Sequence, residues 1–223
     1  MQTSEVMYTL FCKIISKTKF KLISSIKSIN DFIRYFKTCQ AYKLPIGKNR
    51  KYYIQGELHI DGYLQIDEFA SIVVEKGGKL IVGNHVNIEP FCRIHVGKDN
   101  LMVIGESTSL NSFNILIGDI KIGRKCLIAP YVYLSSGMHQ FKGRTSIKEA
   151  DKNYLTKNKG KDFSSPIIVG DDCWLGISSV VMYGSHVGRG CIIGANSVVT
   201  ANKRLEEYEI WGGVPAKYIS KRE

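Results

Sequence analysis

The spacing of apolar residues changes near residue 50. Over residues 5–39 they recur at roughly helical intervals, which predicts a helical segment. Downstream, the sequence breaks into short β-rich pieces separated by turn residues such as Asp61-Gly62 and Gly77-Gly78. The first expected strands are residues 51–54, 58–60, 64–66, 71–74 and 80–82. The pattern therefore predicts a helical N-terminal segment followed by a β domain.

A repeat of six residues dominates the C-terminal half. Aliphatic residues stand at every sixth position from Val169 to Val199, and glycine follows four of these six positions. Cysteine or serine stands four positions after each of the first five aliphatic residues. The same register occurs earlier, at Val82, Ile88, Ile94, Ile122, Ile128 and Leu134. A fixed short period of this kind indicates a repeat architecture.

A six-residue period has a direct structural meaning. One short strand and one turn fit into six residues, three such units close a triangular coil, and coils stack at the ~4.8 Å spacing of paired strands. The aliphatic residue then points inward, the small residue shares the narrow interior, and glycine relaxes the corner. Four of the six cysteines occupy such interior positions, so we expect them to be packing residues: Cys92, Cys126, Cys173 and Cys191.

The repeat is interrupted by one long stretch. Leu134 and Val169 are 35 positions apart (169 − 134), which is not a multiple of six, so a loop leaves at about residue 137 and returns near residue 165. Long excursions from a regular solenoid usually carry function. We expect a basic amphipathic helical segment over 1–49, a β domain over 50–202 that includes this loop, and a C-terminal tail over 203–223. A smaller slip in register lies between Ile94 and Ile122.

Composition narrows the classes of partner. The 223 residues have a net charge of +11, which favours anionic partners such as phosphates, a membrane face or an anionic polymer. No run of 18 apolar residues and no secretory signal pattern is found, so neither a spanning helix nor a signal peptide is expected. Seven basic residues lie between Lys13 and Lys37 and only Asp31 opposes them. The N-terminal helix is therefore expected to pack on protein, with a membrane surface as the alternative.

Four blocks of sequence together resemble a known enzyme family. The blocks are residues 128–139 (IAPYVYLSSGMH), 166–176 (PIIVGDDCWLG), 193–200 (IGANSVVT) and 212–219 (GGVPAKYI). Their order and spacing are similar to those of hexapeptide-repeat acyltransferases, in particular galactoside and maltose O-acetyltransferases and the O-acetyltransferases of polysaccharide biosynthesis. The resemblance covers about residues 80–220. It implies a mainly β fold, a left-handed parallel β-helix, whose handedness the period alone does not set.

The resemblance also implies a chemistry, acetyl transfer from acetyl-CoA to an acceptor hydroxyl with His139 as the general base. Histidine suits the role because the base must take a proton as the hydroxyl oxygen attacks the thioester. In the family a carboxylate or a backbone carbonyl orients this histidine, and the carboxylate candidates here are Glu149, Asp151 and Asp162. Asn111 and Asn114 fall near the family's acceptor-contacting asparagine.

Coenzyme A in this family lies in a groove between neighbouring prisms, so the resemblance implies a homotrimer. No metal is expected. The family's CoA contacts, carried over by motif, fall on Gly176, Ile177, Ala195, Thr200, Ala201, Lys217 and Lys221.

No residue pattern names the acceptor. A sugar hydroxyl of a surface polysaccharide or its precursor is our first interpretation, because a basic N-terminal helix would hold the enzyme near a membrane-bound intermediate. The alternatives are a nucleotide-sugar N-acetyltransferase, an O-acetyltransferase for free sugars, xenobiotics or serine, and, more remotely, a non-catalytic membrane-surface scaffold. A zinc carbonic anhydrase of the same fold is disfavoured because no close pair of histidines lies beside the loop. Nucleic acid is not an expected partner. The expected location is cytoplasmic, with the inner face of the membrane as the alternative.

Overall fold

The computed structural model describes residues 22–47, 49–160 and 163–223. The chain divides into two units, residues 1–37 and 38–223. A helix, α2 (Leu22–Tyr42), begins in the first unit and ends in the second. Four basic residues of the N-terminal segment, Lys13, Lys17, Lys19 and Lys21, lie outside the described residues, so its packing on protein and the alternative, membrane contact, both stay predictions. No helix among the described residues has the length and apolar character needed to cross a membrane.

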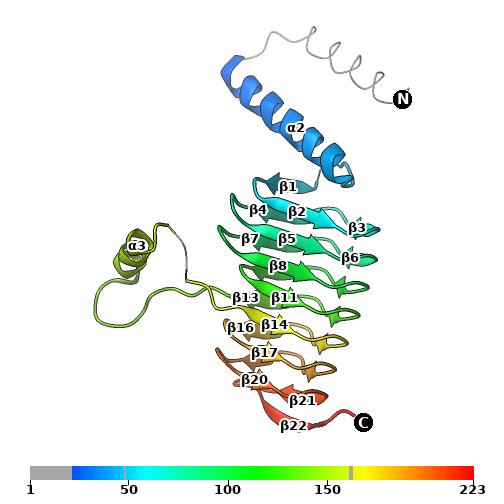
Figure 1. Ribbon diagram of the computed structural model, residues 1–223, viewed down its shortest axis with the longest axis vertical. Coiled ribbons are helices and arrows are strands. Elements are labelled where there is room, and N and C mark those ends of the chain that lie inside the picture. Colours follow the sequence, from blue (N-terminus) through cyan, green and yellow to red (C-terminus); the bar gives the residue numbers. More distant parts are fainter. Residues whose placement is uncertain (1–21, 48, 161–162) are drawn as a thin grey trace. The chain divides into compact units, whose positions relative to one another are not determined.

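Three parallel sheets form the sides of a triangular coil (Figure 1), and each turn of the coil adds one strand to each sheet. Sheet A consists of β1 (Lys51–Ile54), β4 (Ser71–Val74), β7 (Arg93–Val96), β10 (Ile115–Ile117), β13 (Tyr133–Ser135), β16 (Val180–Met182) and β19 (Val198–Val199). Sheet B consists of β2 (Glu57–Ile60), β5 (Lys79–Val82), β8 (Leu101–Ile104), β11 (Ile120–Ile122), β14 (Ile167–Val169), β17 (His186–Val187) and β20 (Arg204–Leu205). Sheet C consists of β3 (Leu64–Ile66), β6 (Val86–Ile88), β9 (Ser109–Leu110), β12 (Leu127–Ile128), β15 (Trp174–Leu175), β18 (Ile192–Ile193), β21 (Glu209–Gly212) and the antiparallel β22 (Lys217–Lys221).

This architecture confirms the predicted fold, a left-handed parallel β-helix preceded by a helical segment and interrupted by a protruding loop. The aliphatic residues of the repeat form a continuous interior column. Leu116 and Leu134, for example, lie side by side on neighbouring strands of sheet A and are fully buried. Each such residue is sealed by the coil before it and the coil after it, which is why a six-residue pattern alone specifies the core.

The coils are not all equally long. Leu116 pairs with Leu134, 18 residues later, whereas Ile72 pairs with Ile94, 22 residues later. Part of the extra length lies at the corner where sheet A leads into sheet B, over residues 75–78 and 97–100. The register slip seen in the sequence between Ile94 and Ile122 therefore reflects coils of unequal length.

The glycines that follow the aliphatic positions act differently from our expectation. We expected them to relax the corner, but the left-handed corner positions between sheets C and A are held by other residues, among them Phe113 and Tyr131. Glycine is required because successive coils touch. A Cβ atom on Gly176 would lie 2.7 Å from the backbone nitrogen of Ala195 in the next coil. Backbone crowding thus replaces backbone freedom as the reason for glycine at Gly176.

Exposed aromatic rings line the corner between sheets C and A in the N-terminal coils. Phe69, Phe91, Phe113 and Tyr131 stack nearly parallel, with centroids 4.7–4.8 Å apart. That separation equals the strand spacing, so the stack follows the coil register.

The four repeat cysteines are buried, as predicted. Cys92, Cys126, Cys173 and Cys191 are each at most 2% exposed. Burial raises the pKa of the Cys92 thiol to about 11, and burial also raises the pKa of Cys191. Because the thiolate is the reactive form, these two groups are inert packing side chains.

Replacing an interior leucine should destabilise the coil much more than replacing an outer one. Leu116→Ala should lower the free energy of unfolding by about 2–5 kcal/mol, because it leaves a cavity in a fully enclosed site. Leu127→Ala is the matched control, because that side chain is 47% exposed. Guanidinium denaturation followed by circular dichroism measures both variants. Equal losses would contradict the assignment of the interior column.

Candidate active site

The long loop leaves the coil after β13 and returns before β14, and its two ends are fastened together. Gly137 and Ser164 form a β-bridge, and the hydroxyls of Ser136 and Ser164 lie 2.7 Å apart. The backbone N–H of Ser165 donates to the Ser136 carbonyl at 2.9 Å. Phe163 packs edge-on between Tyr154 and Tyr183. The loop is therefore anchored at its base, which fixes the chain direction just ahead of His139.

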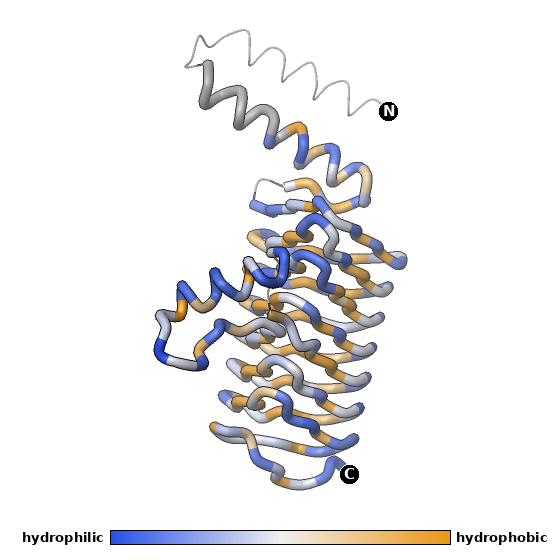
Figure 2. Tube along the Cα trace, turned by 60° about the vertical axis from the view of Figure 1, so that its left-hand side comes forward, coloured by the Kyte–Doolittle hydropathy of each residue, from blue (hydrophilic) through white to orange (hydrophobic). Residues whose placement is uncertain are grey.

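A short helix, α3 (Ile147–Lys157), forms the outer part of the loop. Ser146 caps its N-terminus by accepting a hydrogen bond from the Glu149 N–H, and Asn158 closes its C-terminus on the Tyr154 carbonyl. No residue of α3 is buried, and Figure 2 shows that hydrophilic residues predominate along it. The helix is held by its caps and its base rather than by a core, and one face of it points back at the coil.

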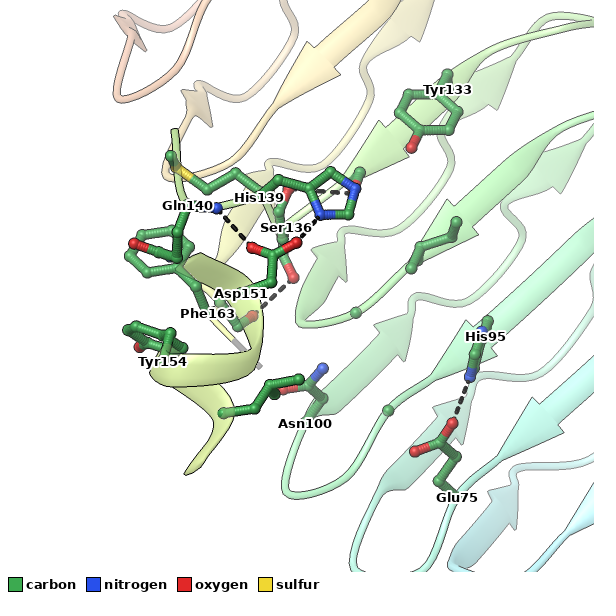
Figure 3. Close-up of a pocket in the computed structure, with 18 residues that line it drawn as sticks. Glu75, His95, Asn100, Tyr133, Ser136, His139, Gln140, Asp151, Tyr154 and Phe163 are labelled. Atoms are coloured by element: carbon green, nitrogen blue, oxygen red, sulfur yellow. Dashed lines mark hydrogen bonds and ion pairs between the residues drawn. The ribbon is translucent and has the colours of Figure 1, made fainter. Parts of the chain in front are cut away.

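The face of α3 nearest the coil carries the partner of His139. The Nδ1 atom of His139 lies 2.7 Å from Asp151 Oδ2, and the backbone N–H of Gln140 donates to Asp151 Oδ1 at 2.7 Å (Figure 3). The His139 side chain is 82% exposed, whereas Asp151 is 27% exposed. Of the carboxylate candidates that the structure describes, Asp151 is thus the one that contacts the histidine. Glu149 lies in the first turn of α3, and Asp162 lies outside the described residues.

The charge state of Asp151 determines which imidazole nitrogen of His139 carries the proton. The hydrogen bond from the Gln140 N–H, followed by the bond from His139, lowers the pKa of the Asp151 carboxyl. An ionised carboxylate only accepts hydrogen bonds, so Nδ1 of His139 donates to it. The Nε2 atom then holds the lone pair. This arrangement makes Nε2 the basic atom of the pair.

A cavity of about 450 Å³ opens beside this pair, between the loop and the outer face of sheet A. One wall comes from the loop and includes His139, Asp151 and Tyr154. The opposite wall comes from sheet A and the long A–B corners, and includes Glu75, His95, Asn100 and Tyr133. The volume falls in the range typical of small-molecule sites, roughly 300–1,000 Å³.

The two predicted acceptor-binding asparagines lie elsewhere, at the corner between sheets C and A. Asn114 is fully buried, donates from Nδ2 to the Ile128 carbonyl and accepts the Val132 N–H at Oδ1. These bonds give its amide a structural function inside the coil. Asn111 is partly exposed at the same corner. Neither residue lines the cavity beside His139.

The predicted CoA-binding residues fall into three places. Ile177 and Ala195 are exposed on successive coils at the C–A corner, with the buried Gly176 next to Ile177. Thr200 and Ala201 follow β19 at the A–B corner, the corner from which the loop departs. Lys217 and Lys221 are exposed on β22. His139 and the C–A positions therefore lie at opposite edges of sheet A within one chain.

Sequence reasoning missed Glu75, His95 and Asn100 as residues of the site. The sequence feature that could have indicated these residues was coil length. The N-terminal coils are longer, and their extra residues lie at the corners that supply Glu75 and Asn100. The register slip did not show which corner had grown, or that this corner faces the loop. No group of three or more His, Cys, Asp or Glu side chains within the described ranges is placed to hold a metal ion.

Known proteins with similar sequences include hexapeptide-repeat proteins and acetyltransferases. The family described as "Hexapeptide repeat of succinyl-transferase" matches residues 166–201. The chain is 35% identical over 109 residues to the putative lipopolysaccharide biosynthesis O-acetyl transferase WbbJ of Escherichia coli, covering 47% of this chain and 52% of that protein. It is 34% identical over 111 residues to the galactoside O-acetyltransferase of the same bacterium, covering 48% of each. The chain resembles the hexapeptide-repeat acyltransferases, as its four sequence blocks predicted.

The likeness has a defined extent. The chain spans about half the length of these two curated relatives. Among solved structures, a mutant of the N-acyltransferase AntD from Bacillus cereus, in complex with dTDP and coenzyme A, aligns with a TM-score of 0.58 and 21% identity. The alignment covers 75% of this chain and 84% of AntD, and at that identity it supports the fold alone.

Asp151→Asn should lower the turnover number about 10- to 1,000-fold. The neutral amide keeps the shape but no longer fixes the proton on Nδ1 of His139. Glu149→Gln is the control on the same helix and should retain wild-type turnover, measured with saturating acetyl-CoA. Because the hydrogen bond from the Gln140 N–H depresses the pKa of the Asp151 carboxyl, Asp151 stays ionised below its usual titration range, and its contribution to the rate should persist as the pH falls from neutral. Equal activity of the two variants would contradict the orienting role of Asp151.

Proposed function

We propose that this chain is an acetyl-CoA-dependent acetyltransferase that acetylates a sugar hydroxyl, with His139 as the general base. The observation that carries the proposal is the 2.7 Å contact between His139 and Asp151 at the edge of a small-molecule cavity. No hydrogen bond from the described residues engages Nε2 of His139, which leaves its lone pair available to an acceptor hydroxyl in the cavity that His139 lines. The named relatives WbbJ and galactoside O-acetyltransferase support this reaction class.

The reaction needs one proton to move twice. Nε2 of His139 takes the proton of the acceptor hydroxyl as its oxygen bonds to the thioester carbonyl carbon. The tetrahedral intermediate then expels the CoA sulfur, which takes the proton back from Nε2 and leaves as the thiol. During the step His139 is cationic, and the ionised Asp151 beside Nδ1 stabilises that charge. The chemistry balances with acetyl-CoA and the acceptor as the only reactants.

Coenzyme A would bind between two chains of a homotrimer. Within one chain, His139 and Thr200 lie towards the A–B edge of sheet A, while Ile177 and Ala195 lie at its C–A edge. A side-by-side arrangement about a three-fold axis would bring the A–B edge of one chain against the C–A edge of the next. Each active site would then contain a histidine from one subunit and CoA contacts from its neighbour, with Lys217 and Lys221 available for the phosphates.

The acceptor we favour is a surface polysaccharide or its precursor, because the relative WbbJ is named as a putative O-acetyl transferase of lipopolysaccharide biosynthesis. A cytoplasmic location, at the inner face of the membrane, would suit such a precursor. The exposed loop carries six described basic residues that could meet an anionic part of the acceptor or of coenzyme A: Lys142, Arg144, Lys148, Lys152, Lys157 and Lys159. Nucleotide sugars, free sugars, xenobiotics and serine are the competing acceptors. A scan of acetyl-CoA consumption over these classes distinguishes them.

His139→Ala should lower the turnover number about 100- to 10,000-fold while leaving the affinity for CoA nearly unchanged, because only the proton acceptor is lost. His186→Ala is the matched control, since His186 lies on the outer face of sheet B and contacts Arg204. Thiol release from acetyl-CoA measures turnover, and calorimetric titration with CoA measures binding. Full activity of His139→Ala would assign the base to another group.

Mixed trimers test the shared site. Ala195→Trp should block the CoA groove from one side, and His139→Ala removes the base from the other, so each variant alone should be inactive. Co-expressed, the two should recover activity, because a subunit with an intact His139 can face a neighbour with an intact Ala195. Activity should be assayed on trimers purified by two different affinity tags, with subunits mixed after folding as the control. Failure of the mixture to exceed either parent would contradict a site built from two chains.

A further inference from the structure

A second histidine–carboxylate pair lies in the cavity and is not used by the proposed proton transfer. Nε2 of His95 lies 2.9 Å from Glu75 Oε1, and the two side chains are 26% and 44% exposed. Among the described residues no partner is recorded for the second oxygen of Glu75. Figure 3 shows this pair on the sheet side of the cavity, with His139 and Asp151 on the loop side. The Glu75–His95 pair thus presents hydrogen-bonding atoms to a ligand in the same space.

The coil register fixes how far this pair lies from the strand residue that leads into the loop. His95, Ile117 and Ser135 stand side by side on β7, β10 and β13. His95 is therefore two strand spacings, roughly 10 Å, from Ser135, the strand residue that leads into the loop carrying His139. The cavity therefore runs across three neighbouring strands of sheet A, a span that suits a ring-sized acceptor better than a single hydroxyl group.

The lining chemistry favours an uncharged ring. Among the described residues that line the cavity there is no lysine and no arginine, whereas two carboxylates, Glu75 and Asp151, face it. A phosphate or carboxylate group would meet like charge from these two carboxylates, without a lysine or arginine among the described lining residues to offset it. Asn100 adds an amide that both donates and accepts, and Tyr133 adds an aromatic wall. Polar groups beside an aromatic ring match the alternating polar and apolar surface of a sugar.

Two glycines keep this part of the cavity open. Gly97 and Gly118 line it next to Asn100, and a Cβ atom on Gly97 would lie 3.2 Å from the Asn100 Nδ2 atom. A Cβ atom on Gly118 would collide with the Ser136 hydroxyl, which accepts the Asp119 N–H at the base of the loop. Larger residues would therefore fill the space or displace the loop.

We infer that Glu75, His95 and Asn100 form an acceptor subsite that binds the uncharged sugar ring and positions its reacting hydroxyl at Nε2 of His139. In this subsite Glu75 accepts from ring hydroxyls, His95 holds the carboxylate in place, and Asn100 contacts a neighbouring hydroxyl. The inference rests on the proposed acetyltransferase function. It makes Glu75 and Asn100 specificity determinants and His95 a positioning residue.

The test uses the full chain with methyl glycosides of galactose, glucose and N-acetylglucosamine as acceptors, and the matching methyl hexuronides as charged counterparts. Glu75→Gln and Asn100→Ala should each raise the KM for the best neutral glycoside about 10- to 100-fold, the effect of a lost hydrogen bond at a charged or buried polar group. The KM for acetyl-CoA and the acceptor-independent hydrolysis of acetyl-CoA should not change. His95→Gln should show a smaller rise, and the hexuronides should be poorer acceptors than the neutral glycosides.

The matched control is another histidine–carboxylate pair on the coil surface, outside the cavity. His59 lies 2.7 Å from Asp61, both are more than half exposed, and neither lines the cavity. Asp61→Asn should leave every kinetic constant unchanged. If Glu75→Gln and Asn100→Ala have the same acceptor KM as Asp61→Asn, the subsite is overturned. The proposed function still stands in that case. A preference of the wild-type chain for the hexuronides would also overturn it. Failure of the wild-type chain to acetylate any sugar would instead overturn the proposed function, and the subsite with it.

Discussion

Close stacking of one coil on the next is the constraint on which the rest of this structure depends. Paired strands sit at the ~4.8 Å spacing, and the interior of each coil is wide enough only for one aliphatic and one small side chain per face. Gly176 shows how little room remains, because a single added carbon would meet the backbone of the next coil. This crowding makes the body rigid and leaves no space inside it for a ligand. A binding site must therefore be built on the outside.

The loop over residues 137–165 solves that problem by placing a second wall against the outer face of sheet A. Ser136 and Ser164 close its base, and the capped helix α3 carries Asp151 back towards His139. The coil contributes the other wall through its longer corners, which bring Glu75 and Asn100 to the cavity. Rigid strands and an anchored loop together hold polar groups in fixed positions, which is the condition for preorganised catalysis.

The distribution of charge separates two kinds of recognition around this site. Exposed lysines and an arginine gather on the loop, whereas the described residues of the cavity beneath it include carboxylates and imidazoles but no lysine or arginine. An anionic part of a substrate would be attracted to the loop and kept out of the cavity. A molecule that carries both an uncharged ring and a charged tail, such as a sugar on a phosphate carrier, fits that division.

The sequence by itself determined the coil, the buried cysteines, the loop and the importance of His139 as a candidate, because a six-residue period and a break in it are local patterns. It left three carboxylates open as partners of His139, and the path of α3 brings Asp151 into contact with it. It gave Asn111 and Asn114 as candidates for acceptor contact, and the tertiary structure shows that the Asn114 amide is buried and hydrogen-bonded inside the coil. The Glu75–His95 pair, 20 residues apart, and their place opposite the loop were decided by the stacking of unequal coils. Residues on different coils become neighbours only when the register of the whole helix is set, and that register is a property of the folded chain.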